Sequence, residues 1–115
     1  MIAASLTVLV AVLHVGFMVL ESVLWTKPTG RKVFGLSRER AETTKDLASN
    51  QGVYNGMLGG CLIWALVAPN PGAQAMLLVF VVIVGIYGAI TVKPTIFAVQ
   101  ALPAILGLGA MFAGI

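Results

Sequence analysis

The chain has 115 residues, of which 59% are apolar and only 10% are charged. Soluble domains carry about a quarter charged residues, so this composition leaves too little polar surface for a soluble protein. The formal net charge is +3, and six of the seven cations fall between residues 26 and 49. Apolar sequence flanks that segment on both sides, so membrane topology explains the charge better than nucleic acid binding does.

Four apolar segments approach or reach the length of about 20 residues that a helix needs to cross a bilayer core. They are residues 2–25, 50–68, 74–92 and 95–115. The first lacks a positively charged start and is too long for the apolar part of a signal peptide, so we expect it to stay in the mature protein. The sequence therefore predicts an all-α integral membrane protein, a four-transmembrane-helix bundle that forms a single membrane domain over residues 1–115.

The connections between these spans differ in length and chemistry. Residues 69–72, Pro-Asn-Pro-Gly, predict a tight turn, and residues 93–94, Lys-Pro, predict a second short connection. The long basic loop, residues 26–49, is expected to be partly helical, because Ser37 is suited to cap a helix that continues into the second span. Pro103 removes a backbone donor inside the fourth span, which predicts a kink or a freed carbonyl in the preceding turn.

All seven cations lie in the first and third connections. In a four-span protein these two connections share one side of the membrane. The positive-inside rule then predicts that both are cytoplasmic, that both termini are non-cytoplasmic, and that the protein is a multi-pass membrane protein.

Gly52, Gly56 and Gly60 recur at every fourth residue of the second span. Small residues let helices approach closely in lipid, where no hydrophobic force drives helices together. We therefore expect these three glycines to form a helix-packing strip, although glycine is also ordinary filler in membrane helices.

Two ionisable side chains, His14 and Glu21, stand seven residues apart and so share a face of the first span. A charge inside a span costs about 2.5–3.5 kcal/mol, so each such group needs a partner or a function. With Trp25 at the cytoplasmic interface, Glu21 lies roughly 6 Å inside and His14 roughly 16 Å inside. Polar side chains of the second span fall at similar depths. The sequence thus predicts a ligand-binding pocket open to the cytoplasm and lined by His14, Glu21, Trp25, Asn50, Gln51, Tyr54 and Asn55.

The alternative interpretation is that these side chains only bond one another between helices. The sequence shows no nucleophile–base pair, metal-ligand cluster or phosphate-binding loop. One histidine and one cysteine fall short of a zinc site. We therefore assign no metal, no cofactor and no catalytic residue, and an enzyme is not favoured.

The run Asn-Gln-Gly-Val-Tyr-Asn-Gly at residues 50–56, with His14, Glu21 and Trp25 upstream, resembles a bacterial family known as domain of unknown function 1304. The resemblance covers essentially the whole chain. It implies a four-helix inner-membrane protein and adds no mechanism, because the role of that family is unassigned. A weaker likeness is to the MAPEG family of membrane glutathione transferases and eicosanoid enzymes. The chain has the asparagine of that family at Asn50 but lacks the arginine and glutamate expected around it.

Three functions remain open. The preferred one is binding or movement of a small amphipathic molecule or ion, with Glu21 as charge partner and His14 as a second protonatable group. The second is a MAPEG-like membrane enzyme acting on a lipid-soluble substrate, with Tyr54 or His14 as general acid. The third is an accessory subunit assembled through the glycine strip. Since four helices enclose little space, we expect a homo-oligomer, a dimer or trimer, with membrane lipid as a further partner.

Overall fold

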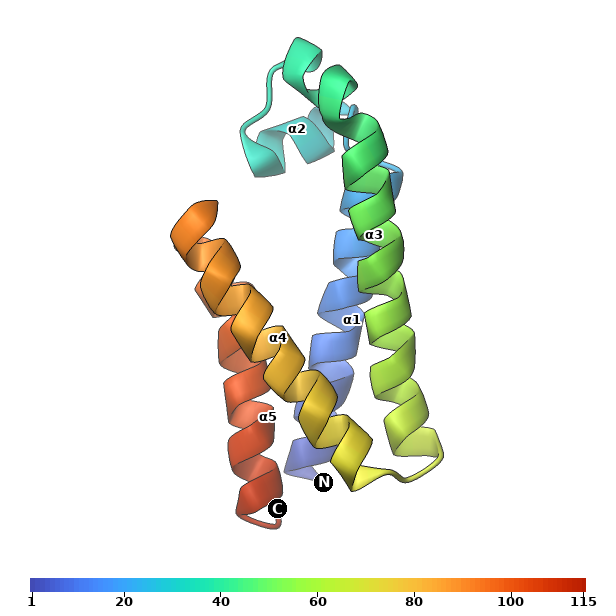
Figure 1. Ribbon diagram of the computed structural model, residues 1–115, viewed down its shortest axis with the longest axis vertical. Helices are drawn as coiled ribbons and strands as arrows, with labels where there is room; N and C mark the ends of the chain where they lie inside the picture. The colour runs from blue at the N-terminus through green and yellow to red at the C-terminus, as the bar shows by residue number, and fades with distance from the viewer. The chain divides into compact units, whose positions relative to one another are not determined.

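A computed structural model that describes residues 1–115 shows an entirely helical chain, which confirms the predicted all-α class (Figure 1). In chain order the elements are α1 (Ile2–Ser22), α2 (Pro28–Phe34), α3 (Arg38–Val67), α4 (Pro71–Thr91), the π-helix η1 (Phe97–Ala101) and α5 (Leu102–Phe112). They form two compact units, one of Met1–Leu13 with Gly59–Ile115 and one of His14–Leu58. The single domain over residues 1–115 stays a prediction.

Two helices, α1 and α4, are long and apolar enough to cross a membrane. Only 22% of the most apolar stretch of each is buried within the chain. The segment Phe97–Phe112 is apolar but shorter. Helix α3 is long enough, but its charged first half and the amides in its middle keep it out of this class. The four-span arrangement and its orientation therefore stay predictions.

The starts of α3 and α4 follow from their capping residues. The backbone N–H of Arg40 donates to Ser37 Oγ over 3.1 Å, so the predicted cap at Ser37 is confirmed and one helix runs from the basic segment to Val67. At the start of α4, the backbone N–H of Ala73 donates to Asn70 Oδ1 over 3.0 Å. This cap lets the helix begin at Pro71, whose missing N–H costs nothing in the first turn.

Two helix irregularities have local causes. Helix α1 ends at Ser22 rather than at residue 25, because the Leu24 N–H donates to the Val19 carbonyl, five residues back, instead of continuing the α-helical ladder. The disturbance expected before Pro103 takes the form of the π-helical turn η1, which lies directly before α5. A proline cannot donate to the preceding turn, so the backbone there is free to widen.

In the first unit, α4 and α5 lie side by side (Figure 1). The buried residues of α4 are spaced three or four apart, which places them on one face: Gln74, Leu78, Val81 and Gly85. A Cβ at Gly85 would lie 2.7 Å from the backbone N of Ala101, so only glycine permits this approach to η1. Glycine and alanine thus act here as small contact residues that let the two helical segments approach closely.

The first unit also contains a buried polar pair. Gln74 Nε2 donates to Thr7 Oγ1 over 2.8 Å, and that hydroxyl donates to the carbonyl of Ala3, also over 2.8 Å. Thr7 is fully buried. The two ends of the chain meet in the same unit, where the Met1 ammonium donates to the Ile115 carbonyl.

Candidate functional site

The second unit is held together by glycine contacts between the end of α1 and α3. Gly52 is buried, and a Cβ there would overlap the Ser22 hydroxyl and lie 3.2 Å from the backbone carbonyl of Met18. The side chain of Met18 lies against Gly56 in the same way. Gly60, by contrast, has nothing within 4 Å within the chain. Two of the three predicted strip glycines thus lie at a helix contact in the single chain, and the third faces outward.

Beyond α1, the chain turns tightly around Trp25. The indole Nε1–H donates to Thr44 Oγ1 on α3 over 3.0 Å, and the indole ring lies 4.8 Å from the ring of Phe34 on α2. Gly30 lies directly against the Leu24 carbonyl, where a Cβ would not fit. These contacts fix α2 against the end of α1, and they position Trp25 beside the first half of α3.

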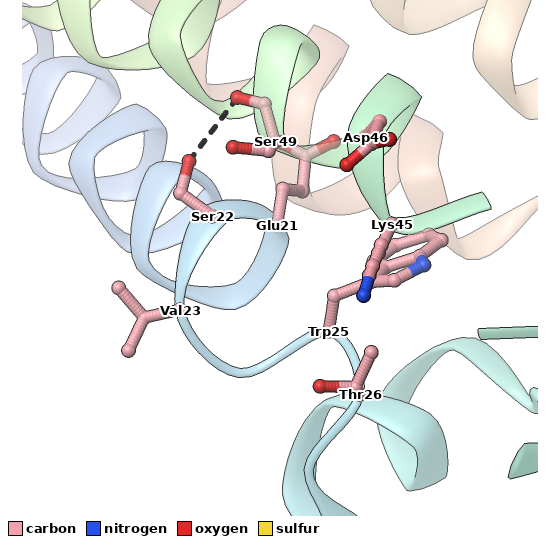
Figure 2. A pocket seen from close by; sticks show the side chains of 8 residues that line it. All are labelled: Glu21, Ser22, Val23, Trp25, Thr26, Lys45, Asp46 and Ser49. Carbon is pink, nitrogen blue, oxygen red and sulfur yellow. Dashed lines mark hydrogen bonds between the residues drawn. The ribbon is translucent and has the colours of Figure 1, made fainter. Parts of the chain in front are cut away.

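Between these elements is a pocket of about 210 Å³ (Figure 2). Part of its wall comes from the end of α1 and the connection after it, and part comes from α3. The lining residues are Glu21, Ser22, Val23, Trp25, Thr26, Lys45, Asp46 and Ser49. The two walls are joined by a hydrogen bond of 3.3 Å from Ser22 Oγ to the Ser49 carbonyl, drawn as a dashed line in Figure 2.

The carboxylates of this pocket lack cationic partners. Glu21 is half-buried, and its Oε1 accepts a hydrogen bond from Asn55 Nδ2. Lys45, which also lines the pocket, pairs with Glu42 of α3, and this hydrogen bond raises the pKa of the Lys45 ammonium. No ion pair is formed by Asp46. The pocket therefore combines two carboxylates, the Lys45 ammonium and an indole, and neither of its carboxylates forms a close ion pair.

The structure brings together some of the residues that the sequence predicted for a site. Glu21 and Trp25 line the pocket, and Asn55 lies behind it, bonded to Glu21. The remaining second-span residues are exposed and do not line it: Asn50, Gln51 and Tyr54. His14 is fully buried, with its ring edge-on to Phe17 at 5.2 Å, and it is not among the lining residues.

Sequence reasoning missed the α3 side of the pocket. The sequence predicted Lys45 on the solvated face of a helix beginning after Ser37, beside Glu42, a contact that the structure confirms, but it assigned neither Lys45, Asp46 nor Ser49 to the site. The signal was available in the Ser37 cap. Once the helix starts there, Lys45 and Ser49 stand one turn apart and lead to Gly52, the residue that contacts α1.

Fold and site together define a small all-helical protein with extensive exposed apolar surface and a polar pocket beyond its first helix. Residues 8–112 match the family described as "Protein of unknown function (DUF1304)". The chain is 32% identical over 111 residues to the uncharacterized protein YpaA of Lactococcus lactis subsp. lactis (strain IL1403), a match that covers 93% of each protein. The chain therefore belongs to the DUF1304 family, which confirms the first resemblance, whereas nothing supports the likeness to MAPEG. No solved structure matches the chain.

Proposed function

We propose that this protein is a four-span protein of the bacterial inner membrane, with the basic segment cytoplasmic and both termini outside. The support is the exposure of large apolar side chains on the helices. On α4 alone, Met76, Ile83 and Ile90 are exposed by 74%, 62% and 79%. Soluble monomers rarely expose apolar patches of this extent, because water solvates them poorly, whereas lipid covers them without cost.

Within that membrane, the protein binds a small amphipathic cation in the pocket at the end of α1. The observation that carries this proposal is the Glu21 carboxylate, which lines the pocket beside Asp46 with no cation paired to it. The lining holds two carboxylates against one ammonium, Lys45, which is already paired with Glu42. A ligand ammonium placed there therefore gains a net negative surrounding and the face of the Trp25 indole, which attracts cations. An anion placed there would meet two carboxylates, and the one cation of the lining, Lys45, is already paired with Glu42.

The size of the pocket indicates which part of the ligand it holds. Sites for whole drug-sized ligands measure about 300–1,000 Å³. The pocket, at about 210 Å³, is large enough for a headgroup only. Val23 lines the pocket and is 63% exposed, so an alkyl tail leaving the headgroup has an apolar surface to follow.

Self-association is part of the proposal. Gln51 and Tyr54 are exposed on α3 at a depth where lipid would surround them, and Tyr54 is exposed by 67%. Polar groups facing hydrocarbon are costly, and a second copy of the chain supplies partners for them. The outward-facing Gly60 on the same helix would allow that copy to approach closely.

The test is a titration of the full chain in nanodiscs of zwitterionic lipid with octyltrimethylammonium, read from Trp25 fluorescence in a Trp64→Phe background. Octyl sulfate, which has the same tail and the opposite charge, is the control ligand. We expect binding of the ammonium compound only. Glu21→Gln should weaken that binding about tenfold, the effect of losing about 1.4 kcal/mol from a partly exposed charge pair.

The matched control variant is Glu39→Gln, which removes the same charge from an exposed side chain of α3 that does not line this pocket. It should leave the affinity unchanged. Equal responses to octyltrimethylammonium and octyl sulfate, or equal affinities of wild type and Glu21→Gln, would rule out a cation site at Glu21. A native mass spectrum of the same sample gives the subunit number.

A further inference from the structure

The segment from Lys27 to Arg40, here called the basic hairpin, comprises α2, the turn after it and the start of α3. It carries five cations and one carboxylate, Glu39, which gives the segment a net charge of +4. The cations are Lys27, Arg31, Lys32, Arg38 and Arg40. None of these five forms a side-chain ion pair, and the ion pair between Lys45 and Glu42 lies outside this segment. All five charges are therefore left without a neutralising side chain.

These cations are presented by a folded element rather than by a mobile loop. Gly35 ends α2 in the left-handed conformation, with φ at 64°, a value that favours glycine. The backbone N–H of Leu36 then donates to the Arg31 carbonyl over 2.9 Å, which closes the turn. At the other end, the contact of Phe34 with Trp25 holds α2 against the end of α1. The charges are thus fixed directly beside one of the two helices able to cross a membrane.

Arg31 has a further property within this group. Its Nε–H is buried and has no hydrogen-bond acceptor in the chain. A buried donor without an acceptor is unfavourable, and native structures rarely contain one without a reason. Because Nε has no exposed surface in this conformation, an acceptor from outside the chain reaches it only when the half-buried Arg31 side chain turns outward. Arginine then binds phosphate through a planar fork that includes this nitrogen, so a phosphate oxygen is a fitting acceptor. Val33 on the same short helix is 43% exposed and adds an apolar side chain to the charged surface.

We infer that the basic hairpin docks on the anionic phospholipid surface next to α1, with a lipid phosphate accepting the hydrogen bond from Arg31. The charge of the segment is complementary to such a surface, which attracts juxtamembrane Lys and Arg residues. Docking would hold the hairpin, and with it the Trp25 side of the pocket, at a fixed depth. The inference rests on the membrane location proposed above, but it does not depend on which ligand the pocket binds.

The experiment compares hydrogen–deuterium exchange of residues 27–40 in the full chain, in nanodiscs of phosphatidylcholine alone and of phosphatidylcholine mixed with phosphatidylglycerol. We expect slower exchange in the anionic bilayer, and less slowing at high salt, which screens surface charge. Lys32→Gln should reduce the slowing roughly fivefold, the factor that corresponds to about 1 kcal/mol per basic residue near an anionic surface. Arg31→Gln removes the same charge and also the phosphate contact, so it should reduce the slowing of exchange more than Lys32→Gln does.

Two further arms decide the interpretation. Arg31→Lys keeps the charge but lacks the planar fork. The slowing of exchange in this variant should therefore be intermediate between that of wild type and that of Arg31→Gln. Inorganic phosphate added to phosphatidylcholine nanodiscs should not slow exchange. Identical exchange in the two bilayers would overturn docking. Slower exchange with free phosphate would show that the anion need not come from a lipid. An equal reduction of the slowing in Arg31→Gln and Lys32→Gln would overturn the Arg31 contact. Resistance to alkaline extraction, measured on the same protein, shows separately whether the chain is inserted in the membrane.

Discussion

Two glycines on α3, Gly52 and Gly60, allow the packing of the second unit to be measured directly. Both lie inside the same helix, so replacing either by alanine gains the same helix propensity, about 1 kcal/mol. Their surroundings differ. A Cβ at Gly60 meets nothing within 4 Å, whereas one at Gly52 meets Ser22 and Met18 of α1. The difference in unfolding free energy between the two variants therefore isolates the helix contact.

The contacts around Gly52 set the size of that difference. The Ser22 hydroxyl is able to rotate away, but it would then lose its bond to the Ser49 carbonyl, worth about 1 kcal/mol. The Met18 carbonyl and the Ser22 backbone N, each 3.2 Å from the added Cβ, move only if the helices separate. Overpacking of this kind costs about 1–3 kcal/mol. We expect Gly60→Ala to raise the unfolding free energy by about 1 kcal/mol relative to wild type. The unfolding free energy of Gly52→Ala should be about 2 kcal/mol lower than that of Gly60→Ala.

The assay is reversible unfolding in mild detergent, followed by circular dichroism against a denaturing detergent, for wild type and both variants. Equal stabilities for Gly52→Ala and Gly60→Ala would refute the contact between α1 and α3. A loss of stability in Gly60→Ala together with a lower subunit number would instead show that Gly60 packs against another copy of the chain.

Two other substitutions test individual hydrogen bonds. Trp25→Phe keeps a ring against Phe34 but removes the hydrogen-bond donor to Thr44, so we expect the unfolding free energy to fall by about 1 kcal/mol in the same assay. Thr44→Val should lower it by the same amount, and the double variant should be no less stable than either single variant. Thr7→Val leaves the buried Gln74 amide without its acceptor and should cost about 1–2 kcal/mol. The double variant Thr7→Val with Gln74→Leu should be more stable than the sum of the two single effects predicts, because no buried amide is then left without an acceptor. If the two changes in unfolding free energy simply add, the hydrogen bond between Gln74 and Thr7 is contradicted.

Local sequence signals predicted the helices well where a capping or breaking residue was present. Ser37 marked the start of α3, and Pro103 marked the irregular turn that the structure shows as η1. The end of α1 was placed too late, at Trp25, because apolar composition does not stop at Ser22. The helix ends in a local turn in which the Leu24 N–H bonds to the Val19 carbonyl, and contacts from outside the helix stabilise that turn: Trp25 bonds to Thr44, and Gly30 lies against the Leu24 carbonyl.

The predicted site was only partly recovered for a related reason. Glu21 was identified because a carboxylate in an apolar helix is costly wherever the helix lies, and the structure places it in a pocket. Asn50, Gln51 and Tyr54 were added because of their depth along α3. Depth does not fix the direction in which a side chain points, and these three residues are exposed and do not line the pocket.

The sequence by itself determined that the chain is helical, apolar and asymmetric in charge, since these properties depend on composition and on residues near one another in the chain. It also identified Glu21 and Trp25 as residues that need an explanation. Only the tertiary structure decided that Lys45, Asp46 and Ser49 share a pocket with them. That result depends on the rotation of α3 about its axis, which is fixed by the contact of Gly52 with α1, and no local pattern encodes such a contact.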